Sequence, residues 1–223
     1  MASAEVTPAR HAHGESGGHG APVVVDDFDD LVRRAESLRR SEGRTLLGIA
    51  GAPGAGKSTL AAALVNRLPR AVLVPMDGLH RSTTELTTLG WVGERGTPRT
   101  FDADRYVALL RRLRTEPDVV YAPDFDRSAE DPVPEAIAVP PDAFVVTEGN
   151  YLLLWPQVRP LLAQCWFVEV PEDVRVARLV ARHVGFGRPK RDALARATTG
   201  SDAANARLVA ATGHLADLVV HGR

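Results

Sequence analysis

Short apolar segments alternate with longer amphipathic segments along most of the chain. Residues 45–50 are apolar without the polar alternation of a half-exposed strand, which is typical of a strand covered on both faces. Further apolar strands are predicted at residues 71–76, 143–147, 165–170 and 217–220. Helical patterns are found at residues 26–40, 59–68, 102–114, 171–183 and 203–214. The alternation predicts an α/β fold with three layers (α/β/α), in which a mostly parallel five-stranded sheet has helices on both faces.

Two segments depart from this alternation. Residues 1–22 are rich in Ala, Gly, Ser and His, so we expect a disordered tail followed by one domain over residues 23–223. The tail histidines His11, His13 and His19 have no rigid frame to hold a metal ion, which favours solvated disorder over a metal site. Residues 79–100 are polar and are expected to form a surface excursion at the ligand end of the sheet.

Composition narrows the class of partner. The 223 residues carry 27 Lys and Arg against 28 Asp and Glu, so the chain lacks the positive charge with which dedicated nucleic-acid binders displace counterions. A single cysteine, Cys165, excludes an intramolecular disulfide. No apolar run approaches the length of a membrane span, and no signal-peptide pattern is present. We therefore expect a cytoplasmic protein without nucleic-acid or membrane partners, and a homodimer stays open.

The strongest motif follows the first of these strands. Residues 51–58 match the pattern GxxxxGK[ST] between a strand and a helix. Glycines allow successive backbone N–H groups to turn toward one anion, and the dipole of the next helix adds positive charge. We expect this P-loop to bind a nucleoside triphosphate, with Lys57 on the β- and γ-phosphates and Ser58 on Mg²⁺; a plain glycine-rich turn is the alternative. The expected phosphate-binding residues are Gly51, Ala52, Pro53, Gly54, Ala55, Gly56, Lys57, Ser58 and Thr59.

Two carboxylates follow predicted strands. Glu148 comes after residues 143–147, where it would orient Mg²⁺ through water or help to position the attacking hydroxyl; capping of the strand is the alternative. Asp77 comes after residues 71–76 and precedes a glycine. It would accept a hydrogen bond from a substrate hydroxyl that attacks the γ-phosphate, as a kinase requires, unless it only forms an Asp-Gly turn.

Five motifs together resemble a known family. They are GxxxxGKST, PMDGLH, RGTPRTFDADRYVALLRRLR, YAPDFDR and VVTEGNYLLL, in that order along nearly all of residues 44–223. The combination resembles the phosphoribulokinase, uridine kinase and pantothenate kinase group of P-loop kinases. Within that group it is most similar to bacterial proteins labelled nucleoside/nucleotide kinase or fructose-transport-system kinase.

The resemblance implies roles for the residues that match these motifs. Asp77 would be the catalytic base, Ser58 and Glu148 would serve the metal, and residues 51–59 would bind the triphosphate. It also implies a small helical lid with arginines on one helical face, namely Arg175, Arg178 and Arg182.

The lid arginines have a catalytic and a structural interpretation. We expect Arg178 and Arg182 to act with Lys57 on the transferring phosphate and to neutralise its charge. A purely solvated helix face is the alternative. Residues 183–190, with two glycines and a proline, are expected to form the mobile tip of the lid.

Acceptor recognition in this group falls after the second strand and around a hairpin before the glutamate strand. Asp126 and Arg127 would grip hydroxyls and an anionic group respectively, or would only form a surface salt bridge. The chain has Leu79 where relatives often carry an aromatic residue, and its stretch of residues 91–96 matches neither the uridine nor the pantothenate type. The candidate acceptor residues are His80, Arg99, Asp126, Arg127, Asn150 and Tyr151, with Asn205 as an outside candidate.

The expected function is transfer of the γ-phosphate of ATP, with Mg²⁺, to a hydroxyl of a nucleoside, sugar or pantothenate-like metabolite. An ATP-hydrolysing switch or metallochaperone-type NTPase that acts on a protein partner is the alternative. The guanine-reading Asn-Lys-x-Asp motif is absent, which disfavours a GTPase. A module that binds nucleotide without catalysis is disfavoured, because Lys57, Ser58, Asp77 and Glu148 are all present.

Overall fold

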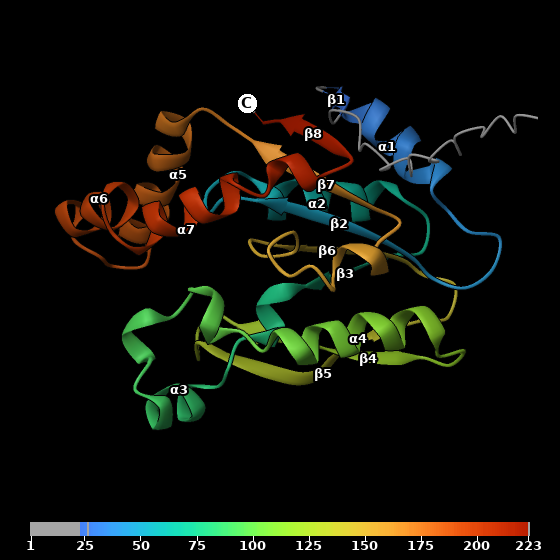
Figure 1. Ribbon diagram of the computed structural model, residues 1–223, viewed down its shortest axis with the longest axis horizontal. Helices are drawn as coiled ribbons and strands as arrows, with labels where there is room; N and C mark the ends of the chain where they lie inside the picture. The colour runs from blue at the N-terminus through green and yellow to red at the C-terminus, as the bar shows by residue number, and fades with distance from the viewer. Residues whose placement is uncertain (1–22, 26, 223) are drawn as a thin grey trace, which may run out of the picture.

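The computed structural model describes residues 23–25 and 27–222 of the chain. The expected disordered tail, with His11, His13 and His19, lies outside the described residues. A central sheet is covered by helices on both faces, and a two-stranded hairpin lies below it in the view of Figure 1.

The central sheet is entirely parallel and has six strands in the order β1-β8-β7-β2-β6-β3. All five predicted strands are present, and the additional strand β1 extends the sheet by pairing with β8. The strands are β1 Val23–Val25, β2 Thr45–Gly51, β3 Ala71–Pro75, β6 Phe144–Gly149, β7 Gln164–Glu169 and β8 Leu218–His221. The separate hairpin pairs β4 Val120–Asp126 with β5 Asp131–Val139 in antiparallel register.

Five helices correspond to the predicted ones: α1 Phe28–Ser37, α2 Lys57–Arg67, α4 Ala103–Thr115, α5 Glu172–Gly185 and α7 Ser201–Ala210. Two more were not expected: α3 Thr83–Leu89 and α6 Lys190–Thr198. Helix α3 lies in the stretch that was expected to be a surface excursion. It begins at a capping box, in which Ser82 and Glu85 bond reciprocally to each other's backbone N–H groups.

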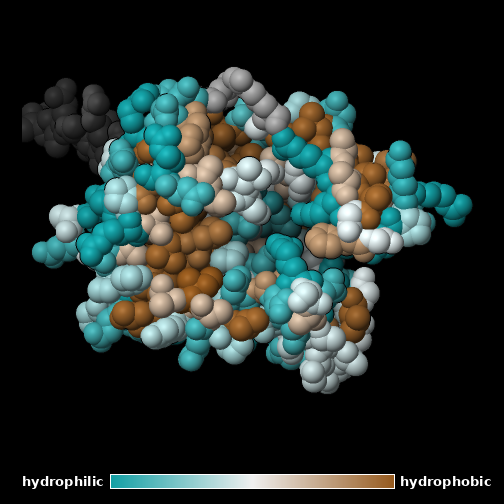
Figure 2. Space-filling view, turned by 180° about the vertical axis from the view of Figure 1, so that it is seen from behind, coloured by the Kyte–Doolittle hydropathy of each residue, from teal (hydrophilic) through white to brown (hydrophobic). Residues whose placement is uncertain are grey.

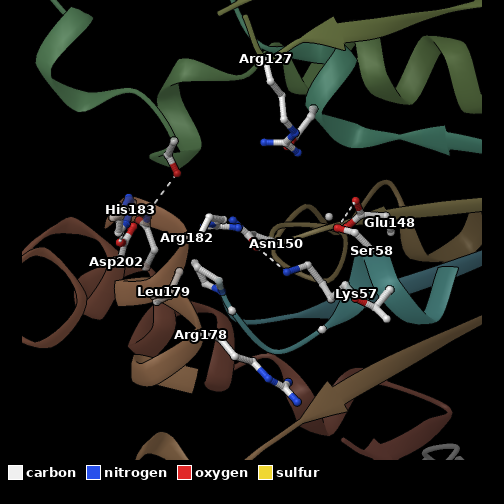
Figure 3. A pocket seen from close by; sticks show the side chains of 18 of the residues that line it. Lys57, Ser58, Arg127, Glu148, Asn150, Arg178, Leu179, Arg182, His183 and Asp202 are labelled. Carbon is white, nitrogen blue, oxygen red and sulfur yellow. Dashed lines mark hydrogen bonds and ion pairs between the residues drawn. The ribbon is translucent and has the colours of Figure 1, made fainter. Parts of the chain in front are cut away.

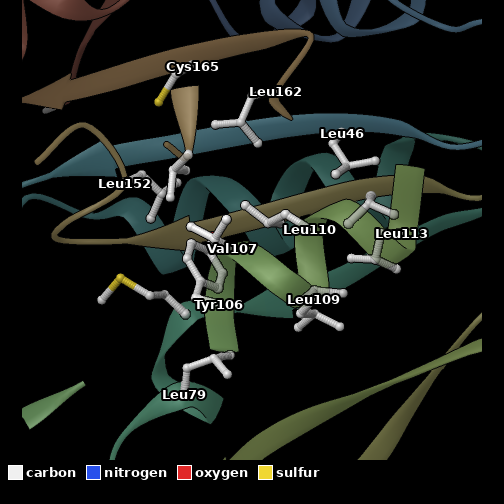
Figure 4. Packing of buried hydrophobic residues seen from close by; sticks show 14 of the residues in the cluster. Leu46, Leu79, Tyr106, Val107, Leu109, Leu110, Leu113, Leu152, Leu162 and Cys165 are labelled. Atoms are coloured by element: carbon white, nitrogen blue, oxygen red, sulfur yellow. The ribbon is translucent and has the colours of Figure 1, made fainter. Parts of the chain in front are cut away.

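Strand β2 sits between two apolar cores, which explains its continuous hydrophobic pattern. Leu46 belongs to the core on the side of α4, and Leu47 belongs to the core on the side of α1 and α2. Figure 4 shows Tyr106 and Leu110 of α4 packed toward the sheet strands in the first of these cores. Because both faces are covered, the predicted three-layer arrangement is confirmed.

The carboxyl ends of the parallel strands meet at one edge of the sheet. In the register of the sheet, Ala50 lies beside Gly149, and Pro75 lies beside Glu148. The segments that follow β2, β3 and β6 therefore emerge side by side. Helices α5, α6 and α7 gather at the left of Figure 1, beside this edge, and form the lid.

Candidate active site

The phosphate cradle connects β2 to α2. Its glycines adopt left-handed backbone angles, with φ of +83° at Gly54 and +103° at Gly56. A Cβ atom on Gly54 would lie 2.8 Å from the carbonyl oxygen of Arg175, so no larger residue fits beneath the lid at this position. The loop thus leads into the N-terminus of α2, where unbonded N–H groups and the helix dipole favour an anion.

Two side chains at the start of α2 are held by groups that follow β6. Lys57 Nζ donates to the side-chain oxygen of Asn150 at 2.8 Å, and Ser58 Oγ donates to Glu148 Oε1 at 2.9 Å (Figure 3). Burial lowers the pKa of Lys57 and raises the pKa of Glu148, and the attraction between the two charges opposes both shifts. The oxygens of Ser58 and Glu148 are the hard ligands that Mg²⁺ prefers.

Asp77 lies one residue into the short 3₁₀ turn Met76–Leu79, at the end of β3. Its carboxylate accepts from Arg127 Nη2 of the hairpin at 2.9 Å. The next residue, Gly78, lies so close to β4 that a Cβ atom would collide with the carbonyl oxygen of Pro123. Glycine is therefore needed here because the hairpin backbone approaches closely, and this approach brings Arg127 to Asp77.

His80 is buried beside Asp77. Its ring packs at a tilt of 39° against Phe101, with 3.8 Å between centroids, and lies 4.9 Å from the ring of Phe125. Its Nδ1 is 3.0 Å from the carbonyl oxygen of Asp77, and because that oxygen only accepts, Nδ1 carries the proton. Burial, as the largest cause, lowers the pKa of His80, so the ring stays neutral and its Nε2 carries a free lone pair.

Two cavities meet at Asp77. The first, of about 380 Å³, is lined by the cradle, by Glu148 and by the lid, and we call it the donor cavity. The second, of about 880 Å³, lies between the hairpin and the tip of the lid, and we call it the acceptor cavity. Asp77, His80, Arg127 and Arg182 line both. Seen from behind, hydrophilic residues surround the hollow beside the lid, whereas apolar residues gather on the side away from it (Figure 2).

The three predicted lid arginines have different surroundings. Arg175 is only 3% exposed; it bonds to Glu172 Oε2 at 2.7 Å and to the carbonyl oxygen of Pro53 at 3.3 Å, so it joins the lid to the cradle. Arg178 donates to the carbonyl oxygen of Ala55 at 3.2 Å and lines the donor cavity. Arg182 points across the cavity opposite Arg127 (Figure 3). Its pKa is lowered, mainly by burial of its guanidinium group.

Three of the candidate acceptor residues have their polar groups bound elsewhere. Arg99 pairs with Glu94, lies over the ring of Trp91 and lines neither cavity. Asp126 lines neither cavity; its carboxylate caps the turn of the hairpin by accepting from the N–H groups of Ser128 and Ala129. Tyr151 is fully buried and donates its hydroxyl to the carbonyl oxygen of Gly96 at 2.6 Å.

Further residues of these cavities were not among the main candidates from the sequence. In the lid, His183 Nε2 lies 2.7 Å from Asp202, and Arg196 lies 3.5 Å from the same carboxylate. The outside candidate Asn205 lines the donor cavity and donates to the carbonyl oxygen of Gly96 at 2.9 Å. Arg188 lines the acceptor cavity, and the only signal for it was its place in the predicted tip of the lid.

The surroundings of Asp77 are those of a two-substrate enzyme. A glycine-rich loop suited to phosphates lies on one side of this carboxylate, and a second, larger cavity lies on the other. Parallel-sheet topology, the GxxxxGK[ST] loop and an arginine-bearing lid place the chain in the class of P-loop kinases.

Similar known proteins narrow this class. No protein-family model matches the chain. A protein of Schizosaccharomyces pombe with the provisional name uridine kinase C227.14 is 37% identical over 179 residues, which cover 73% of this chain and 76% of that protein. The uridine kinase of Borrelia hermsii is 23% identical over 78% of this chain and 85% of its own length. The crystal structure of a Silicibacter protein, provisionally named a fructose transport system kinase, shares 33% identity and a TM-score of 0.78 over 86% of this chain and 98% of its own.

The chain belongs to the uridine kinase-like family of P-loop kinases. It is an ATP-dependent small-molecule kinase that transfers a phosphate group to a hydroxyl, and the alternative of a protein-directed switch is not favoured. The predicted fold class and family resemblance are thereby confirmed. None of the described helices is long and apolar enough to cross a membrane.

Proposed function

We propose that Asp77 is the general base of this kinase and that it receives the proton of the acceptor hydroxyl. The hydroxyl oxygen forms a bond to the γ-phosphorus of ATP, the bond from that phosphorus to the β,γ-bridging oxygen breaks, and ADP leaves. The position of Asp77 supports this role, because its carboxylate borders both cavities. A base must lie within hydrogen-bond reach of the proton that it accepts, and only the boundary between donor and acceptor satisfies this condition.

The donor nucleotide is proposed to extend beyond the cradle into a third, apolar cavity. This cavity has about 640 Å³, is lined by Phe28, Leu31 and Leu60, and shares Gly56 and Thr59 with the donor cavity. A nucleotide whose phosphates occupy the cradle would therefore extend into an apolar space that suits its nucleobase. Its walls come from α1 and the start of α2, together with residues of β7, β8 and α5.

Ser58 and Glu148 are proposed to hold Mg²⁺ with the nucleotide. Their oxygens already lie within hydrogen-bond distance of each other. Among the described residues, no group of three or more His, Cys, Asp or Glu could hold a metal ion, so we expect phosphate oxygens to complete the ligand set. This donor set fits a cation that keeps several waters and bridges phosphates. Bound there, Mg²⁺ would neutralise charge on the phosphates.

Lys57, Arg178 and Arg182 are proposed to neutralise the charge of the transferring phosphate. Lys57 and Arg178 line the donor cavity and not the acceptor cavity, whereas Arg182 lines both. Arg182 is therefore suited to the phosphate as it passes from donor to acceptor. We also propose that residues 23–223 act as one catalytic unit, because the central sheet, the hairpin and the lid all supply lining residues.

The variant Asp77→Asn tests this proposal. We expect phosphate transfer to fall by roughly 10²- to 10⁴-fold, because an amide does not accept a proton, while the affinity for an ATP analogue stays within a few-fold. The rate of ADP release in the presence of nucleosides, sugars, sugar phosphates and pantothenate measures the transfer. The matched control is Asp104→Asn, an exposed position in the first turn of α4. Full activity of Asp77→Asn with any acceptor would remove Asp77 from the role of base.

A further inference from the structure

The acceptor cavity is rich in arginine although the whole chain has a formal charge of −1. Its five arginines face only three carboxylates, and they come from the hairpin side as well as from the lid. The arginines are Arg95, Arg127, Arg182, Arg188 and Arg196, and the carboxylates are Asp77, Glu130 and Asp192.

Two of these arginines are occupied by structural contacts. Arg95 donates to the carbonyl oxygen of Glu130 at 2.6 Å and to the Thr83 hydroxyl at 2.8 Å, and its Nε lies 3.8 Å from the carboxylate of Glu130. Arg196 lies 3.5 Å from Asp202. Both therefore hold the walls of the cavity together.

The remaining three face the space that a substrate would occupy. Arg127 reaches Asp77, whereas no carboxylate of a described residue lies within ion-pair distance of Arg182 or Arg188. Arg182 also borders the donor cavity, so the γ-phosphate accounts for it. Arg188 lies at the tip of the lid, between α5 and α6. It borders the acceptor cavity and not the donor cavity. The donor nucleotide gives no reason for an arginine at this position.

We propose that the acceptor carries an anionic group, a phosphate or a carboxylate, which binds between Arg127 of the hairpin and Arg188 of the lid tip. This inference rests on the proposed function, because it assumes that the cavity holds the acceptor. A planar guanidinium group on each side can form paired, charge-assisted hydrogen bonds to such an anion. A neutral acceptor would make no use of the charge of these two guanidinium groups, which border the cavity from the hairpin and from the lid tip.

The ion pair between Arg127 and Asp77 gives the anion a second role. When the anion attracts Arg127, the carboxylate of Asp77 loses its present partner and becomes free to accept the hydrogen bond of the acceptor hydroxyl. Binding of the correct acceptor thus prepares the base, whereas an acceptor without the anion leaves Asp77 paired. This coupling would select against water as a phosphate acceptor.

Matched pairs of acceptors test the proposal by isothermal titration of the full chain saturated with Mg²⁺ and a non-hydrolysable ATP analogue. The pairs are uridine with uridine 5′-monophosphate, ribose with ribose 5-phosphate, and glycerol with glycerate, so that phosphate and carboxylate are separate arms. We expect at least one charged member to bind about ten- to a hundred-fold more tightly than its neutral partner. Arg188→Gln and Arg127→Gln should each remove most of that difference.

The control is Arg191→Gln, an exposed arginine at the second residue of α6 that lines neither cavity. It should keep both the preference for the charged member and the affinity for the ATP analogue. Equal or weaker binding of the charged member in all three pairs overturns the proposal. A preference that survives in Arg188→Gln and in Arg127→Gln also overturns it, because the anion then binds elsewhere.

A transfer assay with ATP separates this inference from the proposed function. If a charged member binds as expected but no ADP is released in its presence, the anion site stands and the assignment of the cavity to a phosphate acceptor fails. If a neutral member is phosphorylated with a higher kcat/KM than its charged partner, the kinase assignment stands and the anionic acceptor is refuted.

Discussion

Two side chains at the start of α2, which are proposed to act on the phosphates and their metal, are already bonded to other protein groups. Lys57 is held by Asn150, and Ser58 by Glu148. These contacts fix the orientation of the reactive groups before the substrates bind, which lowers the entropy cost of reaching the transition state. They also show why Asn150, expected as an acceptor residue, lines the donor cavity with its side chain directed at Lys57.

His80 yields a prediction at the residue scale. In His80→Asn, the amide can still donate to the carbonyl oxygen of Asp77, but the lone pair of Nε2 is lost. If this lone pair accepts a hydrogen bond from the second substrate, the variant's KM for that substrate should be about ten-fold higher, while its KM for ATP stays constant. Steady-state kinetics with the best acceptor of the transfer assay measures both constants.

His80→Gln is the matched control, because its longer side chain restores an oxygen near the position of Nε2. It should recover part of the acceptor affinity.

Because the pKa of His80 is lowered by burial, the wild-type KM for the acceptor should show no contribution from this ring above about pH 6.5. An unchanged acceptor KM in His80→Asn would exclude His80 from acceptor binding.

At the element scale, one buried guanidinium group joins the end of α4 and the hairpin to the start of β2. Arg44 is 4% exposed and precedes the first residue of β2. Its five N–H groups face five backbone carbonyl oxygens, those of Leu113, Glu116, Asp118, Val139 and Pro140. Leu113 lies in the last turn of α4 and Glu116 is its C-cap residue, where carbonyl groups have no partner within the helix. Arg44 therefore supports the hairpin that carries Arg127.

Arg44→Lys should lower the free energy of unfolding by about 2–4 kcal/mol. Lysine has three donors at a single point, so it leaves buried carbonyl groups without partners. Urea unfolding followed by circular dichroism measures the change. The same substitution at Arg111, an exposed position on α4, should change the free energy by less than about 0.5 kcal/mol. Equal effects at the two positions would contradict the role of Arg44.

Elements with strong local patterns were predictable, and weakly patterned ones were not. Strand β1 has only three residues and pairs only because the chain returns beside β8. Helix α6 follows directly on the predicted lid tip, and only Ala193 and Ala197 of it are buried. Two small buried residues give almost no hydrophobic periodicity, so its position depends on packing against α5 and α7.

At the scale of the whole molecule, the carbonyl oxygen of Gly96 joins three distant segments. Tyr151, just after β6, and Asn205, on the lid helix α7, both donate to it. The segment after α3, the sheet edge and the lid are thereby linked at one point. Gly96 lines both cavities, so a shift of this segment would change the shape of the donor cavity and of the acceptor cavity together.

The global stability should depend on pH through Cys165. Burial raises the pKa of this thiol to about 12, whereas an unfolded cysteine ionises near about 8.5. The folded pKa is the higher one, so the contribution to stability is complete below about pH 8.5 and is lost as pH rises toward 12. The free energy of unfolding should fall by up to about 1.4 kcal/mol per pH unit in this window.

Urea unfolding of the wild type and of Cys165→Ala at a series of pH values tests this dependence. The variant should lack the extra slope between about pH 9 and pH 10, before the ionisation of unfolded tyrosines adds its own dependence. Other titrating groups cancel in the difference between the two proteins. Parallel stability curves would show that the thiol ionises equally in both states.

The sequence by itself determined the glycine-rich loop, five strands of the central sheet and the acids that follow β3 and β6. These features depend on local chemistry: glycines permit the loop, apolar runs form buried strands, and parallel strands end at one edge. The family resemblance depended on the same local motifs. No long-range contact was needed for any of them.

Only the tertiary structure decided the partners of the long polar side chains. Arg127 meets Asp77 because Gly78 lets the hairpin approach, Asp126 is used by the turn, and Arg175 is buried between lid and cradle. Arginine and aspartate can pair with many groups, and the sequence does not say which of them the fold brings within reach. Sequence therefore predicted the half of the site that we propose binds the donor, and long-range packing shaped the half that we propose binds the acceptor.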